Sequence, residues 1–121
     1  EVFSAIGRVV VVEERLFDAV TAVSGSGPAY LYMVIEAMAD AGVREGLSRA
    51  SALELAAQTA LGSAKMVLES GLHPAALRDM VCSPGGTTID AVCTLEEKGL
   101  RAAVESAVRV CAEKSRAMSK Q

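Results

Sequence analysis

The residues best suited to chemistry lie together at Ser83–Thr88, where the sequence is Ser-Pro-Gly-Gly-Thr-Thr. Two glycines and two threonine hydroxyls meet there, directly before an apolar-periodic run that predicts a helix over about 88–98. The first amide N–H groups of a helix have no partner within it, and the helix dipole places partial positive charge at that end. Glycines let a ligand approach the backbone, and threonines add hydroxyl donors. The stretch therefore predicts a cup that suits a carboxylate or a phosphate.

The same stretch has a purely structural interpretation. Thr87 and Asp90 have the spacing of a capping box, in which two side chains satisfy the free amides of a helix start. On this hypothesis the residues make a well-capped helix that binds no ligand.

Other reactive side chains give weaker signals. Glu13 and Glu14 follow an apolar run, at what would be the ligand-binding end of a strand, but the residues alone favour a solvated acid pair that opens a helix. His73 precedes a proline and indicates a loop or capping histidine rather than a catalytic one. Cys82 has no base near it in sequence, which favours packing over nucleophilic chemistry. With one histidine and no CxxC spacing, we expect no metal site.

The glycines Gly25 and Gly27 do not match a dinucleotide-binding loop. Tyr30 occupies the third glycine position of G-x-G-x-x-G, no strand directly precedes the pair, and no βαβ unit follows it. The sequence predicts a loop and a helix N-cap here, and no dinucleotide site within this chain.

Helices are the elements that must position these residues. The valine-rich run Arg8–Val12 predicts one short strand, buried on both faces, for which no later segment offers a partner. Caps and periodicity otherwise predict helices throughout. Their expected ranges are about 2–6 closed by Gly7, 16–23, 28–46, 48 or 51 to 70 with Gly71 as C-cap, 74–81, 88–98 and 100–119.

The helix expected over Pro28–Gly46 is apolar around most of its circumference. Its polar residues Glu36, Asp40 and Arg44 form a single narrow stripe. Such a helix must be enclosed by other helices, and one domain of 121 residues can hardly surround it. The pattern therefore predicts a partner subunit.

Composition narrows the class of protein. The chain is 51% hydrophobic but only 3% aromatic, so its core must be built from Ala, Val, Leu and Met, which favours an all-α domain. The net charge of −3 and the lack of a basic cluster argue against nucleic acid as a partner. No membrane-spanning run or signal peptide is visible, and three unpaired cysteines fit a reducing compartment such as the cytoplasm, or mitochondria in a eukaryote.

Two stretches resemble the pyrroline-5-carboxylate reductase family. The first runs through Asp18–Thr21 and Ser24–Tyr30, and the second through Ser83–Ile89 with Ala91, Leu95 and Glu96. The segments Ala64–Met66 and His73-Pro74 are similar to the family as well. The resemblance covers nearly the whole chain and corresponds to the C-terminal half of these enzymes.

This resemblance implies a domain organisation. Family members carry an N-terminal Rossmann domain that binds NAD(P)H, so residues 1–12 would be the tail of that domain and residues 13–121 the helical dimerisation and substrate-loop domain. The family's C-terminal domains interlock into a homodimer that can assemble further. The full-length enzyme would use NAD(P)H, whereas this chain alone would bind none and be inactive.

The resemblance also implies site residues for the reduction of 1-pyrroline-5-carboxylate to proline. Ser83, Gly85, Gly86, Thr87 and Thr88 would receive the substrate carboxylate. Thr88 matches the family's catalytic residue and would lie near the ring nitrogen of the substrate. Its role would be to orient the substrate, because a hydroxyl is too weak an acid to protonate the imine. Glu14 would face that nitrogen and stabilise the iminium. Met80 departs from the family, since relatives can place a polar side chain there towards the cofactor.

Three hypotheses remain open from sequence. The chain is the dimerising half of a reductase, or a stable fragment or trimmed form of an intact one. Alternatively, it is a helical homodimerisation module without a metabolite site, whose glycine–threonine loop is only a cap.

Overall fold

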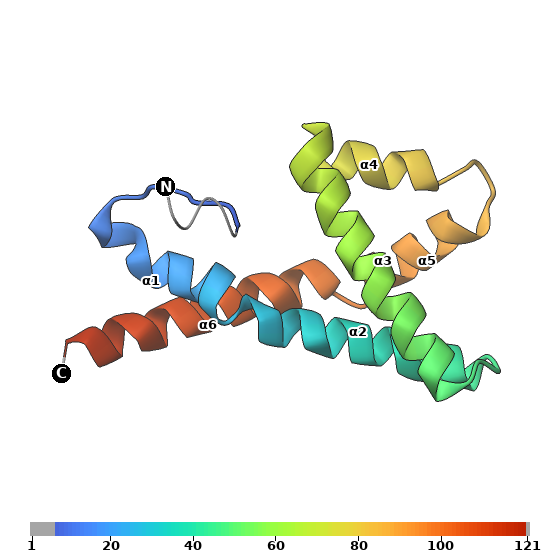
Figure 1. Ribbon diagram of the computed structural model, residues 1–121, viewed down its shortest axis with the longest axis horizontal. Helices are drawn as coiled ribbons and strands as arrows, with labels where there is room; N and C mark the ends of the chain where they lie inside the picture. The colour runs from blue at the N-terminus through green and yellow to red at the C-terminus, as the bar shows by residue number, and fades with distance from the viewer. Residues whose placement is uncertain (1–6, 121) are drawn as a thin grey trace. The chain divides into compact units, whose positions relative to one another are not determined.

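The computed structural model describes residues 7–120, and within that range the chain is helical (Figure 1). A short segment comes first, made of the 3₁₀ turn η2 (Glu14–Leu16), α1 (Phe17–Val20) and the π-helical turn η3 (Thr21–Gly25). Five longer helices follow: α2 (Gly27–Arg44), α3 (Arg49–Ser70), α4 (Pro74–Val81), α5 (Thr87–Glu97) and α6 (Leu100–Ser119). The prediction of an all-α domain of about five helices is confirmed.

The strand expected over Arg8–Val12 is not present. Residues 8–13 adopt no regular secondary structure, and no strand occurs anywhere in residues 7–120. A strand requires a neighbour that pairs with its backbone N–H and C=O groups, and a run of valines does not supply one. Val10 and Val11 are accordingly 80% and 93% exposed. The helix expected over 2–6 lies outside the described residues.

Capping residues set the ends of α3 as the sequence indicated. Ser48 is the N-cap, and its hydroxyl accepts a hydrogen bond from the Ser51 amide at 3.2 Å. The alternative start at Ser51, with Glu54 closing a capping box, is wrong. Gly71 ends the helix with a φ of 72°, a left-handed conformation that costs a glycine little.

The chain divides into two compact units: Pro28–Val104, and Glu1–Gly27 with Glu105–Gln121. Within the first, α2 and α3 form a helical hairpin whose buried contact is a cluster of alanines, with Ile35 and Val43 packed against it. Small residues let the two helices approach closely. An ion pair between Arg49 and Asp40, 2.6 Å long, also joins them. The cluster consists of Ala39, Ala52 and Ala56.

In the second unit, two hydrogen bonds tie the segment before α2 to the last helix. The Ser115 hydroxyl donates to the Asp18 carboxylate at 2.6 Å, and the Cys111 thiol donates to the Ser26 hydroxyl at 3.2 Å. The partners are 97 and 85 residues apart in sequence. These contacts hold α1 and the residue that follows η3 against the C-terminal part of α6.

Within the described residues, the core of the single chain is very small. It consists of alanines only (Ala22, Ala39, Ala52, Ala56 and Ala112), and no large side chain is fully buried. On α2, Leu31, Tyr32 and Met33 are 57%, 69% and 71% exposed. The apolar helix predicted from the sequence is therefore present, and the chain by itself does not enclose it.

Candidate functional site

The Ser83–Thr88 stretch forms a tight turn that leads into α5. The Gly86 amide donates to the Ser83 carbonyl at 3.0 Å, Pro84 follows Ser83, and Gly85 has a φ of 68°. A proline followed by a residue of positive φ, closed by this hydrogen bond, is the signature of a type II turn. A Cβ atom at Gly86 would collide with the Ser83 hydroxyl. The backbone path thus requires a glycine at position 85, whereas a side chain at position 86 would displace the Ser83 hydroxyl.

The turn leads directly into α5, and the N-terminus of this helix has no side-chain cap. Gly86 is the N-cap residue, and no side chain accepts a hydrogen bond at this helix start. The capping box predicted between Thr87 and Asp90 is wrong, because Thr87 is the first residue of the helix rather than its cap. The amides at the start of α5 therefore keep their donor capacity, as an anion site requires.

The turn is also open to solvent. Ser83, Gly85 and Thr87 are exposed, whereas Gly86 and Thr88 are half-buried. Among the described residues, none is hydrogen-bonded to the hydroxyls of Thr87 and Thr88. By contrast, the Thr94 hydroxyl on the same helix donates to the Asp90 carbonyl at 3.0 Å. The structure brings five of the predicted site residues together as one accessible cup.

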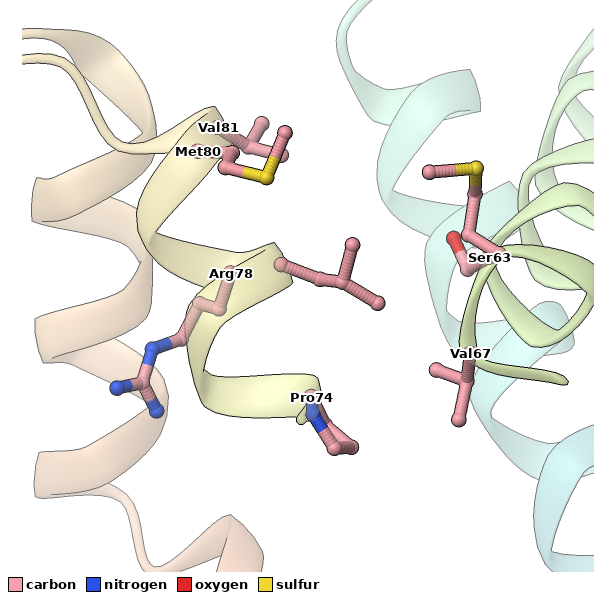
Figure 2. Close-up of a pocket in the computed structure, with 8 residues that line it drawn as sticks. Ser63, Val67, Pro74, Arg78, Met80 and Val81 are labelled. Carbon is pink, nitrogen blue, oxygen red and sulfur yellow. The ribbon is translucent and has the colours of Figure 1, made fainter. Parts of the chain in front are cut away.

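An apolar groove lies beside the helix that precedes the cup. It has a volume of about 390 Å³ between the C-terminal half of α3 and α4. Figure 2 shows Pro74 and Met80 of α4 pointing toward Val67 of α3, whereas the guanidinium of Arg78 points away. Met80 is 72% exposed on this wall of the groove. The methionine thus gives the groove an apolar lining where a polar side chain would have offered a hydrogen bond.

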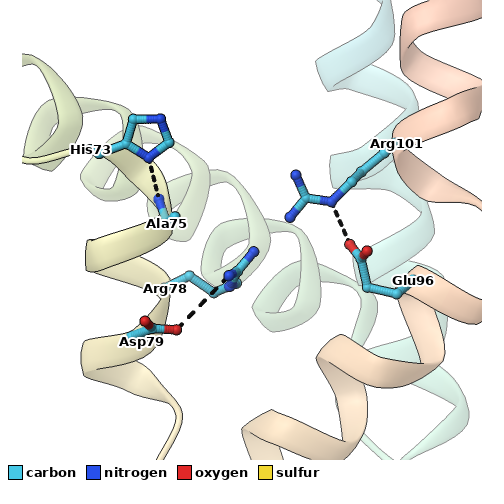
Figure 3. Close-up of polar contacts among 6 residues, drawn as sticks. All are labelled: His73, Ala75, Arg78, Asp79, Glu96 and Arg101. Atoms are coloured by element: carbon cyan, nitrogen blue, oxygen red, sulfur yellow. Dashed lines mark hydrogen bonds and ion pairs between the residues drawn. The ribbon is translucent and has the colours of Figure 1, made fainter.

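His73 caps α4, as the sequence indicated. Its Nδ1 atom accepts a hydrogen bond from the Ala75 amide at 3.1 Å, and Pro74 follows in the first turn (Figure 3). Proline is favoured at that position because it has no N–H to satisfy.

Glu14, the remaining predicted site residue, belongs to the other compact unit. It is exposed and is the first residue of η2. The neighbouring Arg15 pairs with Glu13 at 2.6 Å, so within the described residues the Glu14 carboxylate has no ion-pair partner. The two parts of the predicted site thus fall in different units.

The described residues, 7–120, lack the strand with which a dinucleotide-binding strand–turn–helix unit begins. In the same range, no group of three or more His, Cys, Asp or Glu residues is placed to hold a metal ion. None of the described helices is both long and apolar enough to cross a bilayer. Cys82, Cys93 and Cys111 are free thiols.

Sequence reasoning missed two features. The pairs Asp18–Ser115 and Ser26–Cys111 join residues too distant in sequence for any spacing rule to connect. The groove along α3 and α4 was missed as well, although Met66 and Met80, two of its lining residues, are flexible apolar side chains of a kind common at adaptable surfaces.

Comparison with protein families gives a match over most of the chain. Residues 14–118 match the family described as pyrroline-5-carboxylate reductase dimerisation. Among curated proteins, the chain is 58% identical over 121 residues to pyrroline-5-carboxylate reductase of Methanosarcina acetivorans, covering 100% of this chain and 45% of that protein. It is 59% identical over 119 residues to the Escherichia coli enzyme, covering 98% and 44% respectively. The chain therefore spans less than half the length of these relatives.

Solved structures agree with these matches. Pyrroline carboxylate reductase of Plasmodium falciparum, determined with NADP bound, superposes with a TM-score of 0.89 at 41% identity, over 97% of this chain and 45% of that one. The Streptococcus pyogenes enzyme superposes with a TM-score of 0.88 at 43% identity, over 93% of this chain and 44% of that one.

Proposed function

This chain belongs to the pyrroline-5-carboxylate reductase dimerisation family, and from that premise we propose that it is the C-terminal domain of a reductase that converts 1-pyrroline-5-carboxylate to L-proline in proline biosynthesis. The domain has two tasks. It joins two subunits, and it presents the loop that binds the substrate carboxylate.

The first task follows from the small core. Within the described residues the buried hydrophobic side chains are all alanines, and large apolar side chains of α2 such as Leu31, Tyr32 and Met33 remain exposed. Burying apolar surface stabilises by roughly 25 cal/mol per Å², so a second copy that covers α2 would supply the stabilisation a single chain lacks. The family's role in dimerisation makes that second copy a homodimer partner.

The second task rests on the start of α5, and the absence of any side-chain cap there is the observation that carries it. The backbone amides of Thr87 and Thr88, in the first turn of α5, would hold the substrate carboxylate, and the exposed Ser83 and Thr87 hydroxyls would add donors. The half-buried Thr88 would contact the ring nitrogen as the catalytic residue. Its hydroxyl orients the imine rather than protonating it.

Glu14 would act on the same ring nitrogen from the other unit. Reduction of a C=N bond is easier when the nitrogen is protonated, and a carboxylate facing the resulting iminium stabilises its positive charge. An exposed glutamate without an ion-pair partner in the described chain is available for this role.

The cofactor would be bound outside this chain. NAD(P)H would supply the hydride, and an N-terminal Rossmann domain of the reductase would hold it, a proposal supported by the absence of a strand in residues 7–120. Residues 1–12 are then the end of that domain and residues 13–121 the helical domain. The apolar wall at Met80 would offer the cofactor no hydrogen bond. The three free thiols fit a reducing compartment such as the cytoplasm.

The first prediction tests the substrate loop in the full-length reductase. Thr88→Ala should weaken capture of pyrroline carboxylate by about 1–3 kcal/mol, because a polar partner of the bound substrate is lost. Steady-state kinetics and proline binding by calorimetry measure this change. Thr94→Ala is the matched control, since that hydroxyl is bonded to its own helix.

Equal kinetics for the two variants would contradict the substrate-loop role. That outcome would favour a helical dimerisation module without a metabolite site.

A further inference from the structure

Two hydrogen bonds from α6 hold the segment that carries Glu14. The Ser115 hydroxyl donates to Asp18 of α1 at 2.6 Å, and the Cys111 thiol donates to Ser26, the residue after η3, at 3.2 Å. Positions 111 and 115 are four apart, so both donors lie on one face of α6. Figure 1 shows α1 running beside this part of the helix. All four bonded side chains are half-buried.

Other contacts of this segment are weak within the described chain. Its large apolar side chains are all exposed, namely Leu16, Phe17, Val20 and Val23. Between the two bonded residues lies η3, a π-helical turn of five residues. Such turns are rare and are frequent at functional sites. Because apolar packing holds the segment only loosely, the two hydrogen bonds have a large influence on its position against α6.

The position of Asp18 is passed on to Glu14 through the backbone. Only three residues separate them in sequence. The Phe17 amide donates to the Glu14 carbonyl, so η2 continues directly into α1 without a flexible link. A bond that anchors Asp18 on α6 therefore also orients the turn from which the Glu14 side chain projects.

The same bond leaves Glu14 as the one acid of the segment that is free to act on a ligand. Glu13 pairs with Arg15, and Asp18 accepts the Ser115 hydroxyl at a length typical of a strong, charge-assisted hydrogen bond. In residues 7–120, no side chain pairs with the Glu14 carboxylate. The neighbouring acids are thus held by their own partners.

We infer that Ser115, through its hydrogen bond to Asp18, is a positioning residue that holds Glu14 where its carboxylate faces the protonated ring nitrogen of the substrate. The substrate carboxylate is bound elsewhere, at Ser83–Thr88. Loss of the bond should therefore slow the reduction and leave substrate capture largely unchanged. This inference rests on the role proposed for Glu14.

Steady-state kinetics of the full-length reductase provide the first test. Ser115→Ala should lower kcat about tenfold with little change in KM, because a displaced carboxylate stabilises the transition state less. Ser115→Thr keeps a hydroxyl donor and should retain most of the wild-type kcat. Ser119→Ala is the matched control on the same helix, since that hydroxyl donates to the Ser115 carbonyl at 2.9 Å, and its kcat should be unchanged.

A double-mutant cycle with Glu14→Gln separates positioning from a purely structural role. In the Glu14→Gln reductase, Ser115→Ala should cause little further loss of kcat, because the carboxylate that it positions is gone. Losses that multiply would overturn the inference. Asp18→Asn keeps an oxygen that accepts the Ser115 hydroxyl and should retain most of the activity. A loss as large as that of Glu14→Gln would mean that Asp18 itself acts on the substrate, and would overturn the inference as well.

Sedimentation of the same variants gives a readout independent of activity. Ser115→Ala should keep the mass of the wild-type reductase, and its dissociation or unfolding would assign the bond a structural role and contradict the inference. A wild-type kcat for Ser115→Ala beside an impaired Glu14→Gln would overturn the inference and leave the proposed function intact. An unimpaired Glu14→Gln would instead overturn the proposed role of Glu14, and with it the role of Ser115.

Discussion

At the scale of single residues, the site is determined mainly by two glycines. Gly85 adopts a φ of 68°, and a Cβ atom at Gly86 would displace the Ser83 hydroxyl and lie 3.2 Å from the Ser83 carbonyl oxygen. Together they turn the chain so that Gly86, which has no side chain to offer, becomes the N-cap of α5. The same geometry that removes the usual cap leaves the amides at the helix start available to an anion.

The second prediction concerns Gly85. Gly85→Ala should destabilise the turn by about 1–2 kcal/mol, because a Cβ atom in the left-handed region meets the following carbonyl. Gly85→Asn should cost less, since asparagine tolerates this conformation. Urea denaturation measures the stabilities, and a substrate KM raised in the same order would link the turn to binding. Equal stability of Ala and Asn variants would show that the positive φ is not required.

At the scale of elements, the helices were predictable wherever their ends carry explicit signals. α6 was placed at residues 100–119 and is found at Leu100–Ser119, and the Gly71 C-cap of α3 is in its predicted place. The Thr87–Asp90 capping box was wrong because the spacing of two residues does not reveal which residue precedes the helix. The prediction of a strand at residues 8–12 was wrong because it was based on valine content alone. A strand also needs a neighbouring strand to pair with its backbone.

The site was predictable only in part, for a related reason. Five of the predicted residues lie within the six positions Ser83–Thr88, so a local pattern was enough to group them. The contacts that hold Asp18 and Ser26 on α6 depend on tertiary packing, and no local pattern contains them. The relation of Glu14 to the loop remains a prediction.

The third prediction tests the capping of α3. Ser48→Ala should destabilise the chain by about 1 kcal/mol, because the Ser51 amide loses its acceptor. Ser51→Ala is the matched control and should change stability little, since the donor is the backbone amide of that residue. Urea denaturation of both variants decides the point, and a larger loss for Ser51→Ala would restore the alternative helix start.

At the scale of the whole molecule, the exposed apolar surface is the dominant feature. A monomer rarely leaves a contiguous apolar patch of more than a few hundred Å² in contact with water, and such patches indicate interfaces. Here Leu31, Tyr32 and Met33 are all more than half exposed on one helix. Under the proposed function, dimerisation and substrate binding would be linked, because a second copy that covers this surface would stabilise the domain that presents the Ser83–Thr88 loop.

The fourth prediction is that the 121-residue chain alone oxidises no NAD(P)H in the presence of pyrroline carboxylate. The described residues contain no strand and therefore no dinucleotide-binding unit. Absorbance of the reduced nicotinamide follows the reaction, with a full-length reductase as the positive control. Measurable turnover by the chain alone would refute the assignment of the cofactor to another domain.

Sedimentation equilibrium of the 121-residue chain at micromolar concentration tests the central claim, that a second copy completes the core. The wild-type chain and Glu36→Lys, on the polar stripe of α2, should have at least twice the mass of one chain. Met33→Lys should shift the equilibrium toward smaller species, because a charge would enter the apolar interface. A wild-type chain that stays folded with the mass of a single copy would contradict the account.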